Sequence, residues 1–281
     1  MAAVSTAVPL PVTTGFEPRP RRGGRVVGTA RVVIFVLFAA YYLMPVVAAF
    51  EFTVRGTTGY NLSSWAYILS QPDLTATLGL SLKIAVGTIA ISLLMMVPTV
   101  VWVHLRAPRL RRVIEAVSVL PLVIPAVVLV VGVLSAFQGL PNVIKGTPVI
   151  LSLEYVILAM PYTYRVLDSG VGAIDLKTLV EAARGLGASW LEVLLRVIVP
   201  NLRSSILFSA FLTLALVLGE FTMASLMLFN TFPVWIVQVG QSQAQGAVAV
   251  SIFSLVFAWF LLFAFSLLGA RRRGSRRRRS A

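Results

Sequence analysis

Residues 181–200 read Glu-Ala-Ala-Arg-Gly-Leu-Gly-Ala-Ser-Trp-Leu-Glu-Val-Leu-Leu-Arg-Val-Ile-Val-Pro, the longest stretch in which polar residues interrupt this apolar chain. Just upstream, Asp175 is suited to cap a helix N-terminus, and apolar residues follow it at helical spacing. Gly185 and Gly187 are suited to end that helix. The first half of the region therefore predicts one short helix closed by glycine.

The second half of the stretch has the signature of another helix start. Ser189 and Glu192 stand three residues apart, which is the spacing of a capping box, and Pro200 is expected to end the helix that they begin. The whole region then forms two short helices joined by a glycine turn. Their apolar faces, placed in water, are suited to bind another protein.

The rest of the chain has the composition of a membrane protein. Of its 281 residues, 58% are hydrophobic and only 12% are charged, and the mean hydropathy is +0.91. A soluble domain of this size needs more polar surface than that. The chain has no cysteine, so it has neither disulfides nor thiolate metal sites. We therefore expect an all-α membrane protein.

Six apolar blocks are long enough to cross a bilayer as a helix, which takes about 20 residues. They lie near residues 30–50, 78–103, 113–137, 148–166, 204–228 and 247–268. The sequence predicts three regions: a disordered basic tail over 1–29, a six-helix transmembrane domain over 30–268, and an Arg-rich tail over 269–281. No removed signal peptide is expected, because the first block follows about 30 polar residues.

The positive charges predict the orientation of these helices. All but three of the 24 Lys and Arg residues fall in the two tails and in the second and fourth loops; the exceptions are Arg55, Lys83 and Lys145. Because cytoplasmic loops carry the excess of Lys and Arg, both termini and residues 181–200 are predicted to be cytoplasmic. This distribution also explains the net charge of +14 without nucleic-acid binding, for which aromatic residues should alternate with the basic ones.

At this point the chain resembles a known family, the permease subunits of bacterial ABC importers. The resemblance rests on the spacing of the EAA loop, which here consists of Glu181, Ala182, Ala183, Gly187, Val197, Val199 and Pro200. It extends over roughly residues 70–268. The run Leu-Pro-Leu-Val-Ile-Pro at 120–125 and Leu-Gly-Glu-Phe at 218–221 are most similar to polyamine (spermidine/putrescine) permeases.

The resemblance implies a type I importer permease in the bacterial plasma (inner) membrane, with a cytoplasmic coupling hairpin over 167–203. The implied partners are a cytoplasmic ATPase dimer, a second homologous permease or a second copy of this chain, an extracytoplasmic solute-binding protein, and membrane lipid. The implied substrate is a polyamine. Iron, thiamine, sulfate and molybdate permeases are less similar alternatives, and a secondary transporter is a further alternative that would need several buried ionisable residues.

Three residues are candidates for the translocation path. Pro121 and Pro125 are expected to break one span twice within five residues, and a broken helix can line a substrate path. Glu220 is the one carboxylate well inside an apolar block, where an ionisable group is costly and should face a cavity or a partner. It could bind an ammonium group, or it could be a hydrogen-bonded residue that holds helices together.

The other polar residues in the apolar blocks and loops are expected to have structural roles. Glu154 precedes Tyr155, Tyr162 and Tyr164, a set that is expected to anchor the helix at the membrane interface, with a cation path as the alternative. Asp168 is expected either to cap a helix or to pair with a loop residue, and His104 has no second ligand at metal spacing. The chain has no phosphate-binding Gly-Lys-Ser/Thr loop and no catalytic set, so no enzymatic activity, metal or cofactor is expected and a partner must hydrolyse ATP.

Overall fold

The computed structural model describes residues 24–56, 59–139, 141 and 146–277. The chain divides into two compact units, Met1–Ala48 and Ala49–Ala281. The first unit contains most of α1 (Gly24–Val54), an apolar helix that contains Pro45. All features described below belong to the second unit.

The regular elements described in the second unit are all helices apart from two strands of two residues each, which the sequence did not predict. The strands β1 (Arg55–Gly56) and β2 (Gly59–Tyr60) pair antiparallel. The long helices are α3 (Pro72–Arg106), α4 (Arg111–Val123), α5 (Ala126–Ala136), α7 (Pro148–Gly172), α11 (Arg203–Gly219), α13 (Phe232–Ser242) and α14 (Ala244–Arg277). The shorter elements are α2 (Ser63–Leu69), η1 (Pro108–Leu110), α8 (Leu176–Gly185), α9 (Trp190–Glu192), η2 (Val193–Ile198), α10 (Val199–Asn201) and α12 (Thr222–Leu226).

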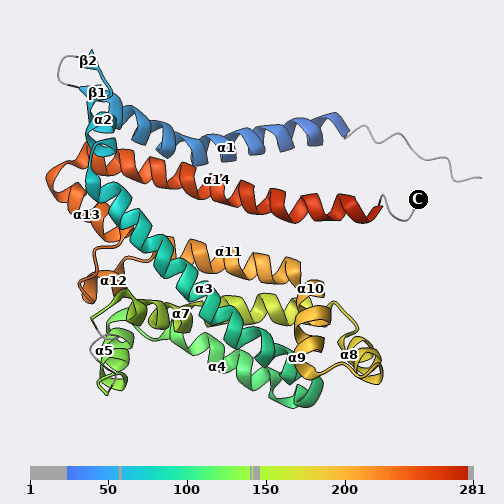
Figure 1. Ribbon diagram of the computed structural model, residues 1–281. Helices are drawn as coiled ribbons and strands as arrows, with labels where there is room; N and C mark the ends of the chain where they lie inside the picture. The colour runs from blue at the N-terminus through green and yellow to red at the C-terminus, as the bar shows by residue number, and fades with distance from the viewer. Residues whose placement is uncertain (1–23, 57–58, 140, 142–145, 278–281) are drawn as a thin grey trace, which may run out of the picture. The chain divides into compact units, whose positions relative to one another are not determined.

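Helices α3, α7 and α11 pack against one another and form the centre of this unit (Figure 1). Small residues allow the close approach, as is usual between membrane helices. A Cβ atom on Gly170 of α7 would overlap Ser205 of α11, and one on Gly87 of α3 would lie 3.2 Å from Ser152 Oγ of α7. Thr88 Oγ1 also donates a hydrogen bond to the backbone oxygen of Ser152 at 3.3 Å. These contacts fix the three helices as one packed group.

Two of the predicted spans are bent pairs of helices. The α4–α5 pair bends by 109°, and the pair formed by Trp190–Asn201 and α11 bends by 77°. The prediction that Pro121 and Pro125 each break their span is wrong. Pro121 lies inside α4, and the helix ends only at Val123, before Pro125 caps α5. One break is sufficient because Pro125 keeps the preceding residue, Ile124, in an extended conformation (ψ 128°).

The predicted span over 204–228 is also not one continuous helix. Helix α11 ends at Gly219, Glu220 adopts an extended conformation, and α12 begins at Thr222. The described residues thus contain four helices long and apolar enough to cross a membrane, or up to six if each bent pair counts as one span. This range is compatible with the six predicted spans.

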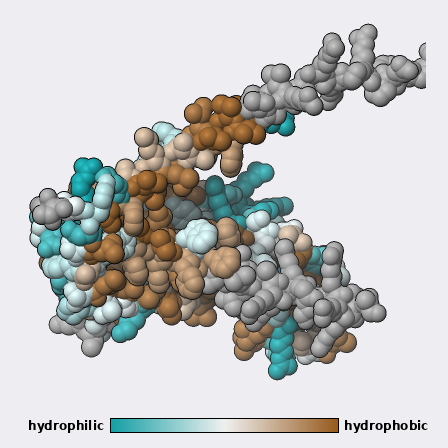
Figure 2. Space-filling view, turned by 90° about the horizontal axis from the view of Figure 1, so that it is seen from above, coloured by the Kyte–Doolittle hydropathy of each residue, from teal (hydrophilic) through white to brown (hydrophobic). Residues whose placement is uncertain are grey.

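Apolar side chains also cover much of the surface of this unit. Val86 and Leu94 on α3, Val131 on α5 and Trp259 on α14 are more than half exposed. Figure 2 shows hydrophobic side chains over a broad area of the face seen there. A surface of this kind is stable against lipid or against another protein chain rather than water.

Candidate functional site

The first half of the predicted hairpin has the expected capping. Asp175 accepts a hydrogen bond from the backbone N–H of Thr178 at 3.3 Å and begins α8. Leu176 and Val180 on one face of α8 are buried. The opposite face carries Glu181, which lies 3.8 Å from Lys177 in an ion pair with both side chains largely exposed. Such an exposed pair contributes little to stability, so Glu181 is available for a partner.

The turn after α8 depends on Gly187. Its φ is +85°, in the left-handed region that favours glycine, and a Cβ atom there would meet no other atom within 4 Å. The backbone N–H of Gly187 donates to Arg184 O at 3.0 Å, and that of Ala188 donates to Ala183 O at 3.1 Å. The turn therefore satisfies the last carbonyl groups of α8, as in a glycine-terminated helix.

The second half of the hairpin begins with the predicted capping box. The Ser189 N–H donates to Glu192 Oε2 at 2.9 Å, and the Glu192 N–H donates to Ser189 Oγ at 3.3 Å. The hydrogen bonds from the Ser189 backbone and hydroxyl lower the pKa of Glu192, because they stabilise its carboxylate. The cap therefore holds a negative charge at the start of the helix, where the helix dipole favours it.

The helix that follows differs from the prediction. Its middle, Val193–Ile198, is a π-helix, and Pro200 does not end it, since the helical conformation continues to Asn201. Pro200 is the second residue of α10, which follows the π-helix without a gap. Wide π-turns occur often at functional sites, and this one lies within the EAA loop.

The hairpin leaves a set of large apolar side chains exposed. We call this set the hairpin apolar face: Leu186, Trp190, Leu191 and Leu195, with exposed fractions from 47% to 90%. Beside it, the guanidinium groups of Arg106 and Arg184 lie 6.0 and 5.4 Å from the Trp190 ring centroid, within cation–π range. A cavity of about 670 Å³ between the end of α3 and this helix has mostly apolar lining.

The residues of the EAA loop lie on both sides of the hairpin. Ala183 and Val199 pack against the buried core of the hairpin, which includes Val180, Val193 and Ile198. The other residues of the predicted EAA loop are exposed or partly exposed: Glu181, Ala182, Gly187, Val197 and Pro200. The sequence analysis did not identify the exposed leucines, because spacing alone does not separate them from core residues.

A second cluster surrounds Glu220, at the break between α11 and α12. Glu220 Oε1 accepts a hydrogen bond from the Met223 N–H at 2.8 Å, and Oε2 accepts from the Ala224 N–H at 3.3 Å. The hydroxyl of Tyr155 on α7 donates to Oε2 at 2.6 Å. In this conformation the Glu220 carboxylate therefore caps α12 and ties it to α7. This geometry fits the helix-holding interpretation of Glu220.

The carboxyl group of Glu154, the residue before Tyr155, forms no hydrogen bond with the described residues. Glu154 is fully buried, and neither of its oxygens has a hydrogen-bond partner among the described residues. Tyr155 and Tyr164 are each only 1% exposed. The prediction that these tyrosines anchor α7 at the membrane interface is therefore wrong for both, because α3 and α11 surround α7 and leave these rings no contact with lipid headgroups. Only Tyr162 is exposed, at 40%.

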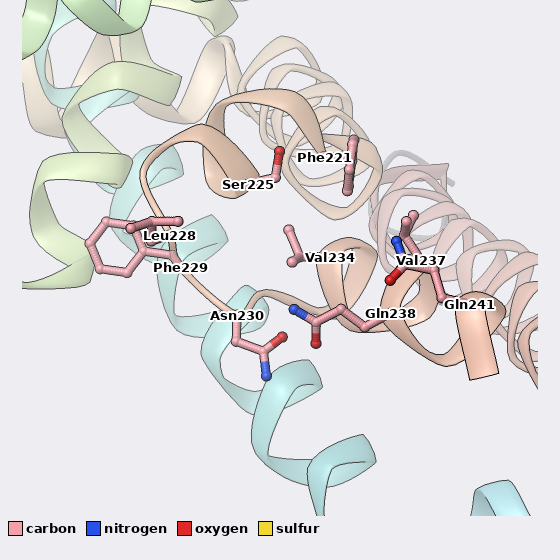
Figure 3. Close-up of a pocket in the computed structure, with 9 residues that line it drawn as sticks. All are labelled: Phe221, Ser225, Leu228, Phe229, Asn230, Val234, Val237, Gln238 and Gln241. Carbon is pink, nitrogen blue, oxygen red and sulfur yellow. The ribbon is translucent and has the colours of Figure 1, made fainter.

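A pocket of about 260 Å³ lies between α12 and α13 (Figure 3). None of its lining residues carries a charge: Phe221, Ser225, Leu228, Phe229, Asn230, Val234, Val237, Gln238 and Gln241. The side-chain amide groups of Asn230 and Gln238 point toward each other (Figure 3). Leu228 has a φ of +61°, unusual for a residue with a branched side chain, and is 92% exposed. The sequence analysis did not identify this pocket, although its amides recur at helical spacing on α13.

The start of α4 is tied to α7 by Asp168. Arg111 donates to both carboxylate oxygens of Asp168, at 2.7 and 2.5 Å, and His104 Nε2 lies 3.5 Å from the same group. The hydroxyl of Tyr164 donates to the Arg111 carbonyl oxygen at 3.2 Å. The predicted loop pairing of Asp168 is confirmed. Within the described residues no group of His, Asp or Glu could hold a metal ion.

The fold and the hairpin together define a helical membrane protein of the transport class. A family model described as "Binding-protein-dependent transport system inner membrane component" matches residues 101–274, and the chain belongs to this family. It is the permease subunit of an ABC importer for a solute, and a separate ATPase subunit supplies the energy. The comparison with curated proteins gives no match.

A solved structure has the same fold. It is a bacterial ABC transporter involved in the import of the acidic polysaccharide alginate, with a TM-score of 0.69 and 16% sequence identity. The match covers 89% of this chain and 99% of the other. At this identity the likeness shows the fold of a type I permease and says nothing about the solute.

Proposed function

We propose that this permease crosses the bacterial plasma membrane six times, with both termini in the cytoplasm. Each bent pair then counts as one span, and the hairpin lies on the cytoplasmic side. The concentration of Lys and Arg in the tails and in the loops around Arg109 and Arg184 supports this orientation. The apolar surfaces of α3 and α14 support contact with lipid and with a second permease, either homologous or identical.

The hairpin is proposed to bind the ATPase. The observation that carries this proposal is the hairpin apolar face, a set of exposed leucines and a tryptophan beside a glycine turn with left-handed backbone. In an isolated chain such a surface would be unfavourable, and it gains stability when an ATPase covers it. Closure of the ATPase dimer then moves α8 and α9 and, through them, the membrane helices. The EAA-loop residues make or support this contact.

The charge on Glu181 gives the sharpest test. Glu181→Lys reverses the charge that faces a partner, whereas Lys177→Gln removes only the internal ion pair. We expect Glu181→Lys to reduce co-purification of the ATPase at least tenfold and Lys177→Gln to leave it unchanged. Equal retention of the ATPase by both variants would remove the support for this site. If both variants lost the ATPase equally, the effect would come from the ion pair between Lys177 and Glu181.

A polyamine is the proposed solute, delivered by an extracytoplasmic binding protein. The support is the similarity of 120–125 and 218–221 to polyamine permeases, together with two carboxyl groups, the buried Glu154 and the partly buried Glu220. Purified complex in proteoliposomes should take up putrescine or spermidine only with ATP. Uptake that follows an ion gradient without ATP would favour a secondary transporter, and ATP-driven uptake of iron, thiamine, sulfate or molybdate would replace the polyamine.

A further inference from the structure

Glu154 is the buried polar group that the fold leaves unsatisfied. Its side chain has no exposed surface, and neither oxygen accepts or donates a hydrogen bond within the described residues. No ion pair in that part of the chain reaches either Glu154 or Glu220. A buried carboxyl group without a partner is stable only as the neutral acid or next to a cation. Even the neutral acid retains an O–H donor with no acceptor.

The role of Glu220 differs from that of Glu154. Its two oxygens already accept three hydrogen bonds, from Met223, Ala224 and the Tyr155 hydroxyl. These bonds commit Glu220 to holding α12 on α7. The fully buried Glu154 and the partly buried Glu220 both adjoin Tyr155, the first as its neighbour in the sequence of α7 and the second through a hydrogen bond. Among the described residues no cation pairs with either carboxyl group.

This region is also where the membrane helices are discontinuous. Helix α11 stops at Gly219 and α4 stops at Val123, and the segments that follow, α12 and α5, pack against each other. Residues of both, together with Tyr155, belong to one buried cluster. In transporters, discontinuous helices commonly form the substrate site. We expect a change in the packing of these segments to expose the region around Tyr155, which Glu154 adjoins.

We propose that Glu154 binds an ammonium group of a cationic solute, and that Glu220 and Tyr155 position it. In the closed, solute-free conformation Glu154 holds a proton. When the bundle opens, that proton passes to water, the carboxylate forms, and the N–H donors of the ammonium group take its place. An ammonium group supplies both of the things that Glu154 lacks, a positive charge and several donors. This proposal rests on the cationic solute proposed above and identifies the residue that recognises it.

The test compares Glu154→Gln with Glu115→Gln in the assembled complex. Glu154→Gln preserves the shape of the neutral acid but cannot become charged. Glu115 is a partly exposed carboxylate that pairs with Arg165 at 3.6 Å, so its variant removes a carboxylate elsewhere in the chain. We expect both variants to assemble and to hydrolyse ATP, but Glu154→Gln should lower ATP-driven putrescine uptake at least tenfold while Glu115→Gln leaves it unchanged.

An infrared measurement tests the proton directly. The solute-free complex should show the carbonyl stretch of a neutral carboxylic acid that is missing in Glu154→Gln and present in Glu115→Gln. Adding putrescine should remove this band and release a proton. Wild-type putrescine uptake by Glu154→Gln, or a band that putrescine leaves unchanged while uptake proceeds, would overturn the inference alone. A wild-type complex that hydrolyses ATP without importing any cation would overturn the proposed solute and the inference with it.

Discussion

At the scale of single residues, Gly187 shows how one backbone angle can control the hairpin. Because φ is +85° and the space around it is open, a side chain there meets a conformational cost without a clash. Gly187→Ala should destabilise the hairpin by about 1–2 kcal/mol, whereas Gly187→Asn should cost less, because Asn visits the left-handed region. Co-purification of the ATPase and thermal unfolding in detergent measure the difference. If Ala and Asn had equal effects, the loss of stability would come from the size of the side chain and not from the backbone conformation.

Glu220 leads to a second prediction, because both of its oxygens accept hydrogen bonds. Glu220→Gln places an NH₂ group against a donor. Since hydrogen bonds to charged groups contribute about 1.5–3 kcal/mol, we expect a loss of folded yield. Tyr155→Phe should have a smaller effect, because the two backbone bonds to Glu220 remain. Size-exclusion yield and melting temperature measure both. A Gln variant as stable as the wild type would contradict the capping role.

The sequence could indicate that Glu220 is special, but it could not show why. The sequence alone shows that this carboxylate lies inside an apolar block and that it therefore needs a partner. Its actual partners, the Met223 and Ala224 amides, become available only because α11 ends at Gly219. The sequence could not predict the burial of Tyr155 either, because that burial depends on which helices surround α7.

At the scale of elements, the capping box is the feature that local sequence predicts best, since it involves only residues 189–192. Replacing Ser189 with Ala should destabilise this helix start by about 0.5–2 kcal/mol. Hydrogen exchange at the Glu192 amide measures the change. Exchange as slow as in the wild type would contradict a role for the Ser189 hydroxyl.

The same cap should depend on pH. The pKa of Glu192 is lowered in the folded state. Its contribution to stability is therefore present above the unfolded pKa of about 4.3 and is lost as pH falls through the lower folded value. The protection of the Ser189 amide, its exchange rate relative to an unstructured peptide at the same pH, should fall over that acidic range in the wild type. Glu192→Gln keeps an oxygen that can accept the Ser189 N–H but does not titrate, so it should show no such transition.

The interrupted helices were less predictable. Pro121 and Pro125 have the same local chemistry, yet one lies inside α4 and the other begins α5. The difference comes from tertiary packing, because α5 is held against α12 and α4 against α7. Hydropathy could find the apolar blocks but could not show where the α4–α5 span bends, since every residue around that bend is apolar.

At the scale of the whole molecule, the proposed orientation can be tested because the chain contains no cysteine. Single cysteines at Gly56 and Gln241 should react with an impermeant reagent from outside intact cells. Those at Ala188 and Ser275 should react only after the membrane is opened. The expected pattern follows from the positions of Lys and Arg. Labelling of the Ala188 position from outside would contradict both the six-span arrangement and a cytoplasmic hairpin.

The contact between Arg111 and Asp168 has a mechanical consequence. It fastens the start of α4 to α7, and α7 is separated from α8 by only three residues. A pull on the hairpin would therefore reach α7 and the start of α4 together. At its other end, α4 is followed by α5, which packs against α12 and shares a buried cluster with α7. Because Ile124 is the extended residue between α4 and α5, we expect any displacement of α4 relative to α5 to be taken up there.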